Sequence, residues 1–191
     1  MVDVRKERWN KQAGTQVGRE ERELFEKVIL PHLNSAYNLA RWLTRNEQDA
    51  EDIVQDSFVR ALRSFDTFRP TEDGRAWLLA IVRNCCRTWH QRSRVAQAVE
   101  LDVDSQPALA AWSDPEALLR NAGDSEQLHA AIGELPLEYR EVLILRELEE
   151  LSYKEIAQIV EVPLGTVMSR LSRARRELYA RLSASGGQVG R

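Results

Sequence analysis

Residues 151–178, LSYKEIAQIVEVPLGTVMSRLSRARREL, contain the pattern of two helices joined by a short turn. Ser152 followed by Glu155 is the signature of a capping box, which predicts that the first helix starts at Tyr153. The letters EVP interrupt that helix, and Pro163 suits the first turn of the next one. The spacing therefore predicts a helix-turn-helix.

The second of these helices has an apolar back and a polar, arginine-rich front. At about 100° per residue, its apolar stripe consists of Val167, Leu171, Ala174 and Leu178. Arginine can bond guanine bidentately, and serine or threonine can bond bases or phosphates. A solvated amphipathic helix is the alternative, but the capped helix and the short turn before it favour DNA contact. The candidate DNA-contacting residues are Thr166, Ser169, Arg170, Ser172, Arg173 and Arg176.

The composition of the 191 residues is that of a folded, mostly helical protein. No apolar stretch approaches the roughly 18 residues that cross a bilayer, and residues 1–23 lack the apolar core of a signal peptide. Cys85 and Cys86 are adjacent and no CxxC pair exists, which supports neither a disulfide framework nor a structural zinc site. We therefore expect a cytoplasmic protein without membrane insertion, metal or other cofactor.

The charges are segregated along the chain, although the formal net charge is only -3. Residues 75–94 contain five arginines and no acidic residue, and residues 151–191 contain seven basic residues against three acidic ones. Between them, residues 100–126 hold seven acidic residues against one arginine. Two basic segments separated by an acidic one indicate a polyanionic partner such as nucleic acid.

Two helical stretches flank the acidic segment, and each is long enough for a modest core. The segment between them contains Pro107 and Pro115 and lacks sustained helical periodicity, which suits a linker. The sequence therefore predicts an all-α protein of two small helical domains joined by an acidic linker. The expected parts are a disordered tail (1–19), a first domain (20–97), the linker (98–124), a second domain (125–182) and a flexible tail (183–191).

The first domain ends with a second basic helix, AWLLAIVRNCCRTWHQRSR, at residues 76–94. A basic stripe along one edge of a helix can follow a phosphate backbone. Trp77 and Trp89 could stack on bases, but core packing is the favoured role for tryptophans on an apolar stripe. The stripe consists of Arg83, Arg87, His90 and Arg94.

Before that helix lies FDTFRPTEDG, residues 65–74, where aromatic rings and an arginine adjoin a loop with a proline and a glycine. Such a loop suits single-stranded nucleic acid, whose bases stack on aromatic rings. The same rings can equally pack into the core. The candidate residues are Phe65, Phe68 and Arg69.

The helix EQDAEDIVQDSFVRALRSF, residues 47–65, is acidic on one face and apolar on the other. Asp49, Asp52 and Asp56 on the acidic face allow three interpretations: solvated acids near a helix N-terminus, a docking face for a basic partner, or a magnesium site for a diphosphate substrate. The enzyme interpretation requires a matching acidic motif across a large apolar cavity, and the sequence shows neither. Other catalytic patterns such as GxSxG and HExxH are absent, so we expect no enzymatic activity.

The order of these features resembles the extracytoplasmic-function (ECF) sigma factors of bacterial RNA polymerase, over about residues 21–182. DAEDIVQDSFVRAL (49–62) is similar to the region 2.2 helix of that family. FDTFRPTEDGRAWLLAIVRNCCRTWHQR (65–92) is similar to its promoter-melting and -10 segment. LPLEYREVLILRELEELSYKEIAQIVEVPLGTVMSRLSRARREL (135–178) is similar to its region 4.

The resemblance implies a role for each segment in transcription initiation. The helix 163–178 would read the -35 element in the major groove, and the acidic linker would occupy the polymerase channel near the RNA exit path. The loop 65–74 would trap a base flipped from the opened -10 strand, with Arg83, Asn84 and Arg87 nearby. The residues that would dock on the clamp helices of the largest polymerase subunit are Asp49, Asp52, Gln55 and Asp56.

The resemblance also implies a regulatory partner, because such proteins are usually held inactive by an anti-sigma factor. Two positions depart from the family pattern: Thr88 stands where the family often has Asp, and Met168 where it often has Arg. The alternatives from the residues alone are a helix-turn-helix regulator with a sensory first domain and the metal-dependent enzyme. We expect a sigma subunit that binds core polymerase and promoter DNA, duplex and single-stranded.

Overall fold

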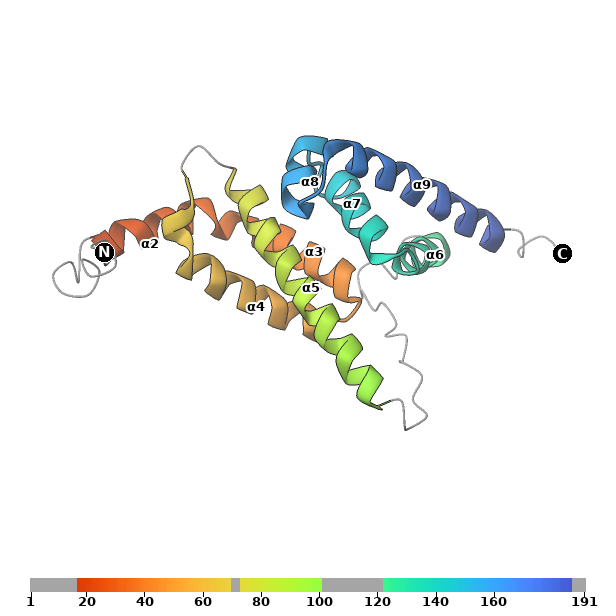
Figure 1. Ribbon diagram of the computed structural model, residues 1–191, viewed down its shortest axis with the longest axis horizontal. Coiled ribbons are helices and arrows are strands. Elements are labelled where there is room, and N and C mark those ends of the chain that lie inside the picture. The colour runs from red at the N-terminus through yellow and green to blue at the C-terminus, as the bar shows by residue number, and fades with distance from the viewer. Residues whose placement is uncertain (1–16, 70–72, 101–121, 187–191) are drawn as a thin grey trace.

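The computed structural model describes residues 17–69, 73–100 and 122–186, and Figure 1 shows how their helices are arranged. These residues form helices and short connections without a strand, which confirms the all-α prediction. Most of the expected N-terminal tail and of the acidic linker, together with residues 70–72 and 187–191, lies outside the described residues.

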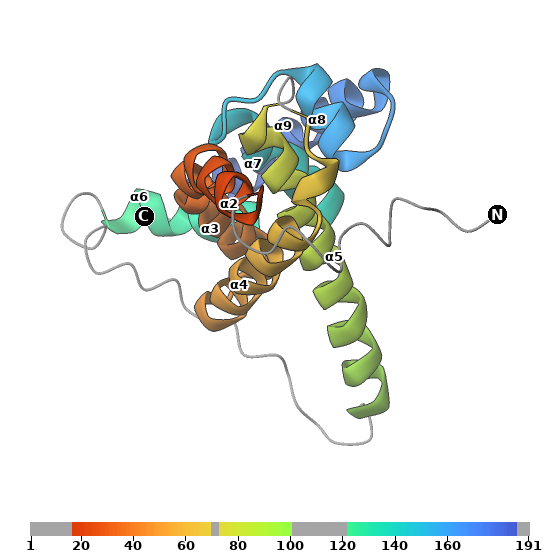
Figure 2. The same ribbon diagram turned by 90° about the vertical axis from the view of Figure 1, so that its left-hand side faces the viewer.

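The N-terminal lobe comprises the described residues up to position 100. Its helices are α2 (Val17–Val28), η1 (Leu30–His32), α3 (Leu33–Thr44), α4 (Glu47–Arg63), η2 (Phe65–Thr67) and α5 (Gly74–Glu100), of which η1 and η2 are single 3-10 turns. Helices α3, α4 and α5 pack against one another, with Leu39, Leu43 and Leu79 fully buried in the core. Helix α5 has 27 residues, and its C-terminal part projects beyond the rest of the lobe (Figures 1 and 2).

Two local features fix how the helices of this lobe meet. Asn46 caps α4, because its side-chain oxygen accepts a hydrogen bond of 3.1 Å from the backbone N–H of Asp49. Gly74 begins α5 where the chain passes close to the end of α2. A Cβ atom at Gly74 would lie 2.6 Å from Cγ1 of Val28 and 2.8 Å from its carbonyl oxygen, so this approach requires glycine.

The C-terminal lobe comprises the described residues from 122 onward. Its helices are α6 (Ala122–Gly133), α7 (Leu137–Glu147), α8 (Tyr153–Val160) and α9 (Leu164–Gly186). The predicted capping box is present: the Ser152 hydroxyl accepts from the Glu155 backbone N–H at 3.3 Å, and the Glu155 carboxylate accepts from the Ser152 N–H at 2.7 Å. The back of α9 is buried against α7 and α8, which confirms the helix-turn-helix prediction; its fully buried residues are Val167, Leu171 and Ala174.

The two lobes pack against each other, an arrangement that the sequence did not predict. Helix α5 lies against α8, and α3 lies against α7 (Figures 1 and 2). Trp42 of α3 and His129 of α6 meet edge to face across this boundary, with ring centroids 5.0 Å apart. Gly133 at the end of α6 approaches Arg45, whose Nε would lie 3.1 Å from a Cβ atom at position 133. The boundary between the lobes therefore buries side chains from both.

Candidate nucleic-acid interface

The outer face of α9 carries most of the residues that the sequence predicts for duplex DNA. Four of them are exposed on the side opposite the buried stripe: Ser169, Ser172, Arg173 and Arg176. Thr166 is half-buried in the first turn, where its carbonyl oxygen accepts a 3.0 Å hydrogen bond from the Ser169 hydroxyl. Two arginines and two small hydroxyl side chains are thus exposed on one face, and these residue types can bond base edges and phosphates.

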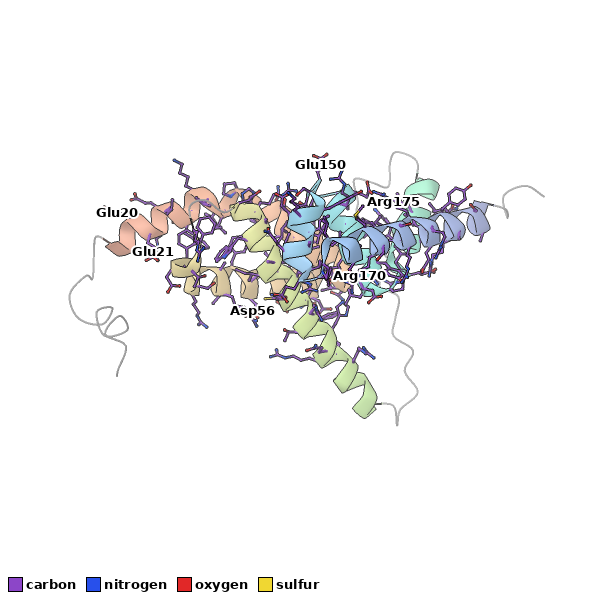
Figure 3. The ribbon with its side chains drawn as sticks, turned by 45° about the horizontal axis from the view of Figure 1, so that its top comes forward. Glu20, Glu21, Asp56, Glu150, Arg170 and Arg175 are labelled. Carbon is purple, nitrogen blue, oxygen red and sulfur yellow. The ribbon has the colours of Figure 1, made fainter. Side chains whose placement is uncertain are left out.

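The arginines on the two edges of α9 are already engaged with acidic side chains of α7. Arg175 bonds Glu147 at 2.6 Å, and this hydrogen bond raises the pKa of the Arg175 guanidinium. Arg170 is half-buried and lies 3.7 Å from both Glu138 and Glu141. Figure 3 shows Arg170 and Arg175 on different sides of the helix, with Arg170 toward the N-terminal lobe. Arg170 also lines the space between the two lobes, together with Arg83 and Arg87 of α5.

Arg83 of α5 lies inside the molecule, not on an exposed basic stripe as the helical wheel predicted. It is 1% exposed, and its Nε and Nη2 donate to the two carboxylate oxygens of Glu141 at 3.1 and 3.3 Å. Nη2 also donates to the carbonyl oxygen of Val160 at 3.1 Å. The wheel placed Arg83 beside Arg87 correctly, but the C-terminal lobe covers Arg83 and leaves Asn84 and Arg87 exposed.

His90 is likewise withdrawn from the predicted stripe. Its Nε2 lies 2.9 Å from the carbonyl oxygen of Leu43, and burial lowers the pKa of the imidazole. Arg140 of α7 donates to the same carbonyl at 3.3 Å and to that of Trp42 at 3.2 Å. Burial, together with the charge of Arg45, lowers the pKa of Arg140 to about 10. Arg140 thus joins the C-terminal lobe to α3, whereas the contact of His90 lies within the N-terminal lobe, and neither side chain faces solvent as a nucleic-acid contact would.

The aromatic residues predicted to stack on bases pack mainly into the N-terminal lobe. Phe65 is 4% exposed and meets the rings of Phe25 and Phe68 at centroid distances of 5.1 and 5.3 Å. Phe68 is half-buried, also against Trp77 at 5.4 Å. Base stacking does not fit the placement of Phe65, whose ring is covered on several sides. Arg69, next along the chain, is exposed.

The four residues of α4 that were predicted to dock on polymerase divide into one structural residue and three surface ones. Asp49 is half-buried, and its carboxylate accepts a 3.2 Å hydrogen bond from the indole N–H of Trp89. Asp52, Gln55 and Asp56 are exposed, and Asp56 pairs with Arg60 at 2.9 Å. Figure 3 shows Asp56 on the N-terminal lobe, away from α9. No group of three or more acidic, histidine or cysteine side chains in the described part of the chain is placed to hold a metal ion.

A cavity of about 450 Å³ lies between the lobes and was not foreseen from the sequence. Arginines from both lobes line it together with carboxylates of α7, namely Arg83, Arg87, Arg170, Glu138 and Glu141. One sequence signal is Glu141, which directly precedes the apolar run 142–145 of α7, because a carboxylate among buried neighbours requires a cationic partner.

Comparison with known proteins identifies the family. Residues 28–95 match the family described as Sigma-70 region 2, and residues 125–178 match Sigma-70, region 4. The ECF RNA polymerase sigma factor SigE of Mycolicibacterium smegmatis is 35% identical over 157 residues, which cover 81% of this chain and 60% of that protein. RNA polymerase sigma factor YlaC of Bacillus subtilis is 32% identical over 164 residues, covering 86% of this chain and 95% of that one.

The fold agrees with a solved structure of a relative. A crystal structure of the sigma factor RpoE in complex with the anti-sigma factor NepR from Bartonella quintana matches with a TM-score of 0.65 and 29% identity, covering 87% of this chain and 98% of that one. Within the described residues, no helix is both long and apolar enough to span a membrane. The two matches lie in the same order as the two lobes, and together with the relatives they show that the chain belongs to the sigma-70 family, as an ECF sigma factor of RNA polymerase.

Proposed function

We propose that this chain binds core RNA polymerase in the cytoplasm, recognises promoters through -35 and -10 elements, and directs initiation at a specific set of genes. The observation that carries the proposal is the exposed polar face of α9, set on a capped helix-turn-helix in a chain that also contains a region 2 lobe. Such a protein catalyses no bond chemistry. Binding energy offsets the cost of unpairing and unstacking bases, a few kcal/mol for each flipped base.

In this proposal, α9 enters the major groove at the -35 element. Arg173 and Arg176, which share the exposed face with two serines, are positioned to bond base edges. Arg170 flanks that face and suits a phosphate. The full set assigned to the -35 element is Thr166, Ser169, Arg170, Ser172, Arg173 and Arg176.

The -10 element would be held by the start of α5 and the loop before it. Arg69, Asn84 and Arg87 are exposed and able to contact an opened strand. Phe68 is half-buried and partly accessible, whereas we assign Phe65 to the core of the lobe. Arg83 can join this set only when the C-terminal lobe moves away from it.

The exposed acids of α4 would form the polymerase-docking face, with Asp49 supporting the helix from inside. In Asp52→Lys, a side chain that faces a basic partner becomes repulsive, so we expect about tenfold weaker binding to core polymerase or more. Fluorescence anisotropy of the labelled chain against purified bacterial core polymerase measures the change.

Glu26→Lys is the matched control for Asp52→Lys, because it changes net charge equally from an exposed position on α2, outside the docking residues of α4. It should leave polymerase affinity within about twofold, and both variants should bind promoter duplex normally. Equal losses in the two variants would remove Asp52 from a specific docking face.

An anti-sigma factor is the proposed regulatory partner, because the similar RpoE was solved in complex with the anti-sigma factor NepR. The decisive experiment for the whole proposal is run-off transcription with core polymerase and a library of genomic promoter fragments. We expect initiation at defined start sites only when this chain is added. Tight operator binding without any initiation would instead identify a two-domain helix-turn-helix regulator.

A further inference from the structure

The exposed face of α9 consists of two parallel rows of residues, because residues four positions apart lie along one line of a helix. Each row begins with an apolar or small residue, continues with a serine and ends with an arginine. The first row is Leu164, Met168, Ser172 and Arg176, and the second is Gly165, Ser169 and Arg173, all of them exposed. The face is therefore graded, from apolar at the N-terminal end of α9 to basic further along.

The apolar start of the first row is uncovered. Leu164 is 42% exposed and Met168 is 52% exposed. Single exposed apolar side chains are common on protein surfaces, so exposure alone assigns no role. Their position is what matters, because Met168 is followed one turn later by Ser172 and two turns later by Arg176, both proposed to contact the -35 element. A duplex that contacts those two residues also comes within reach of Met168.

Gly165 leaves a space open beside Met168, three positions away on the same face of α9. A Cβ atom at Gly165 would meet no atom within 4 Å, and its φ is not positive, so the fold itself does not require glycine there. Glycine is also the poorest helix former after proline. What glycine provides at this exposed position is room for another molecule to approach the backbone of the helix closely.

The base edges of the major groove match the two ends of this graded face. Arginine bonds the O6 and N7 atoms of guanine, whereas thymine presents a methyl group that takes apolar contacts. A methionine side chain is apolar and flexible, so it can pack on such a methyl group. The basic end of the face thus suits guanine, and the apolar end suits thymine.

We propose that Met168, together with Leu164, reads the 5-methyl group of a thymine at one end of the -35 element, and that Gly165 lets the duplex approach closely enough for this contact. The proposal rests on the function proposed above, because it places α9 in the major groove of that element. Met168 and Arg176 are about 12 Å apart along the helix axis. The thymine read by Met168 and a guanine read by Arg176 therefore belong to different base pairs.

The thymine methyl group and the Met168 side chain are removed separately and together to test this contact. A pool of duplexes with a randomised central segment is selected on the immobilised full-length chain, with core polymerase and without it, after duplexes that bind core polymerase alone have been discarded. The strongest binder is the probe. Deoxyuridine then replaces thymine at one position at a time, which removes only the 5-methyl group. Fluorescence anisotropy measures the affinity of each duplex.

Deoxyuridine at one thymine of the probe should weaken binding by the parent chain about fourfold, the cost of leaving one methyl group unburied. In Met168→Ala the same replacement should change affinity by less than about twofold, because the side chain that covers the methyl group is gone. Met168→Leu keeps an apolar side chain of similar volume, so it should retain the sensitivity to deoxyuridine. Leu24→Ala is the control and should behave as the parent chain does, because it removes a side chain of α2 that is also 42% exposed.

Gly165→Ala tests the close approach of DNA separately from stability. Alanine favours helix and would meet no neighbouring atom in the folded chain, so the midpoint of urea unfolding should stay the same or rise. Binding of the selected duplex should nevertheless fall by about tenfold or more, because the new methyl group occupies space in the interface. Equal duplex binding by Gly165→Ala and the parent chain would show that no molecule approaches this position closely, and would overturn that half of the proposal.

Two results would overturn the thymine contact. The first is equal sensitivity to deoxyuridine in the parent chain and in Met168→Ala at every thymine of the probe. The second is an unchanged duplex affinity of Met168→Ala combined with weaker binding to core polymerase, because Met168 would then contact protein instead of DNA.

The thymine contact and the proposed function fail in different ways. Specific run-off transcription together with no loss of affinity on methyl removal refutes the thymine contact alone. A methyl-dependent duplex preference without initiation at any promoter refutes the role in initiation, and leaves α9 as the reader of a helix-turn-helix regulator. Absence of binding to every duplex, with core polymerase and without it, refutes both.

Discussion

Replacing Phe65 with alanine should lower the free energy of unfolding by about 3–5 kcal/mol, the usual cost of removing a buried phenyl ring. Phe65 is 4% exposed and contacts Phe25 from α2, Phe68 and Trp77, so its ring joins three separate parts of the N-terminal lobe. Urea unfolding followed by circular dichroism measures the change. Because the expected loss is a large fraction of the stability of a small domain, the variant should also unfold at a much lower temperature.

Phe65→Leu and Arg69→Ala are the controls that separate packing from base stacking. Leucine fills most of the volume that the phenyl ring occupies. Phe65→Leu should therefore keep most of the stability that Phe65→Ala loses, and it should support run-off transcription. Arg69 is exposed, so Arg69→Ala should lower the free energy of unfolding by no more than about 1 kcal/mol while weakening contact with the -10 strand. A Phe65→Ala chain that keeps full stability but fails to open promoters would contradict the core placement and restore the stacking role.

The features that could be predicted from the sequence are those with local causes. The capping box at Ser152 and Glu155 depends on residues three positions apart, and it starts α8 at Tyr153 as expected. The buried stripe of α9 follows from helical periodicity alone, and so does the exposure of Arg173 and Arg176 opposite it. Such local patterns predict the folded structure correctly because tertiary packing only has to cover the apolar face of the helix.

The burial of Arg83 has a non-local cause, and the sequence therefore could not reveal it. A helical wheel assigns an arginine opposite an apolar stripe to solvent, but the partner of Arg83 is Glu141, 58 residues along the chain. Phe65 shows the converse case, because a ring at the edge of a loop suits base stacking and core packing equally until its neighbours are known. In both cases tertiary packing decided between two roles that the residue type allows.

Replacing Arg173 and Arg176 together with alanine should abolish most -35-dependent initiation. Each bidentate arginine–guanine contact contributes about 1–3 kcal/mol of discrimination, so loss of two such contacts should reduce specific promoter binding by about 30-fold or more. Both side chains are exposed and alanine favours helix, so the unfolding free energy should be unchanged within about 0.5 kcal/mol. Run-off transcription and duplex competition assays with core polymerase measure the loss.

Lys27→Ala combined with Arg63→Ala is the control for charge, because it removes two exposed cations from the N-terminal lobe. If α9 reads bases, the control should retain most of the activity, and the arginine variants should lose their preference at particular -35 positions. If the arginines contact only phosphates, binding weakens equally on all sequences and its salt dependence falls by about one counterion for each arginine. Equal losses in both double variants would show that net charge, and not the face formed by Arg173 and Arg176, carries the interaction. Sequence preference and salt dependence together separate base recognition from electrostatic attraction to phosphates. Loss of a base contact changes the sequence preference, whereas loss of a phosphate contact changes the salt dependence and leaves the preference as it was.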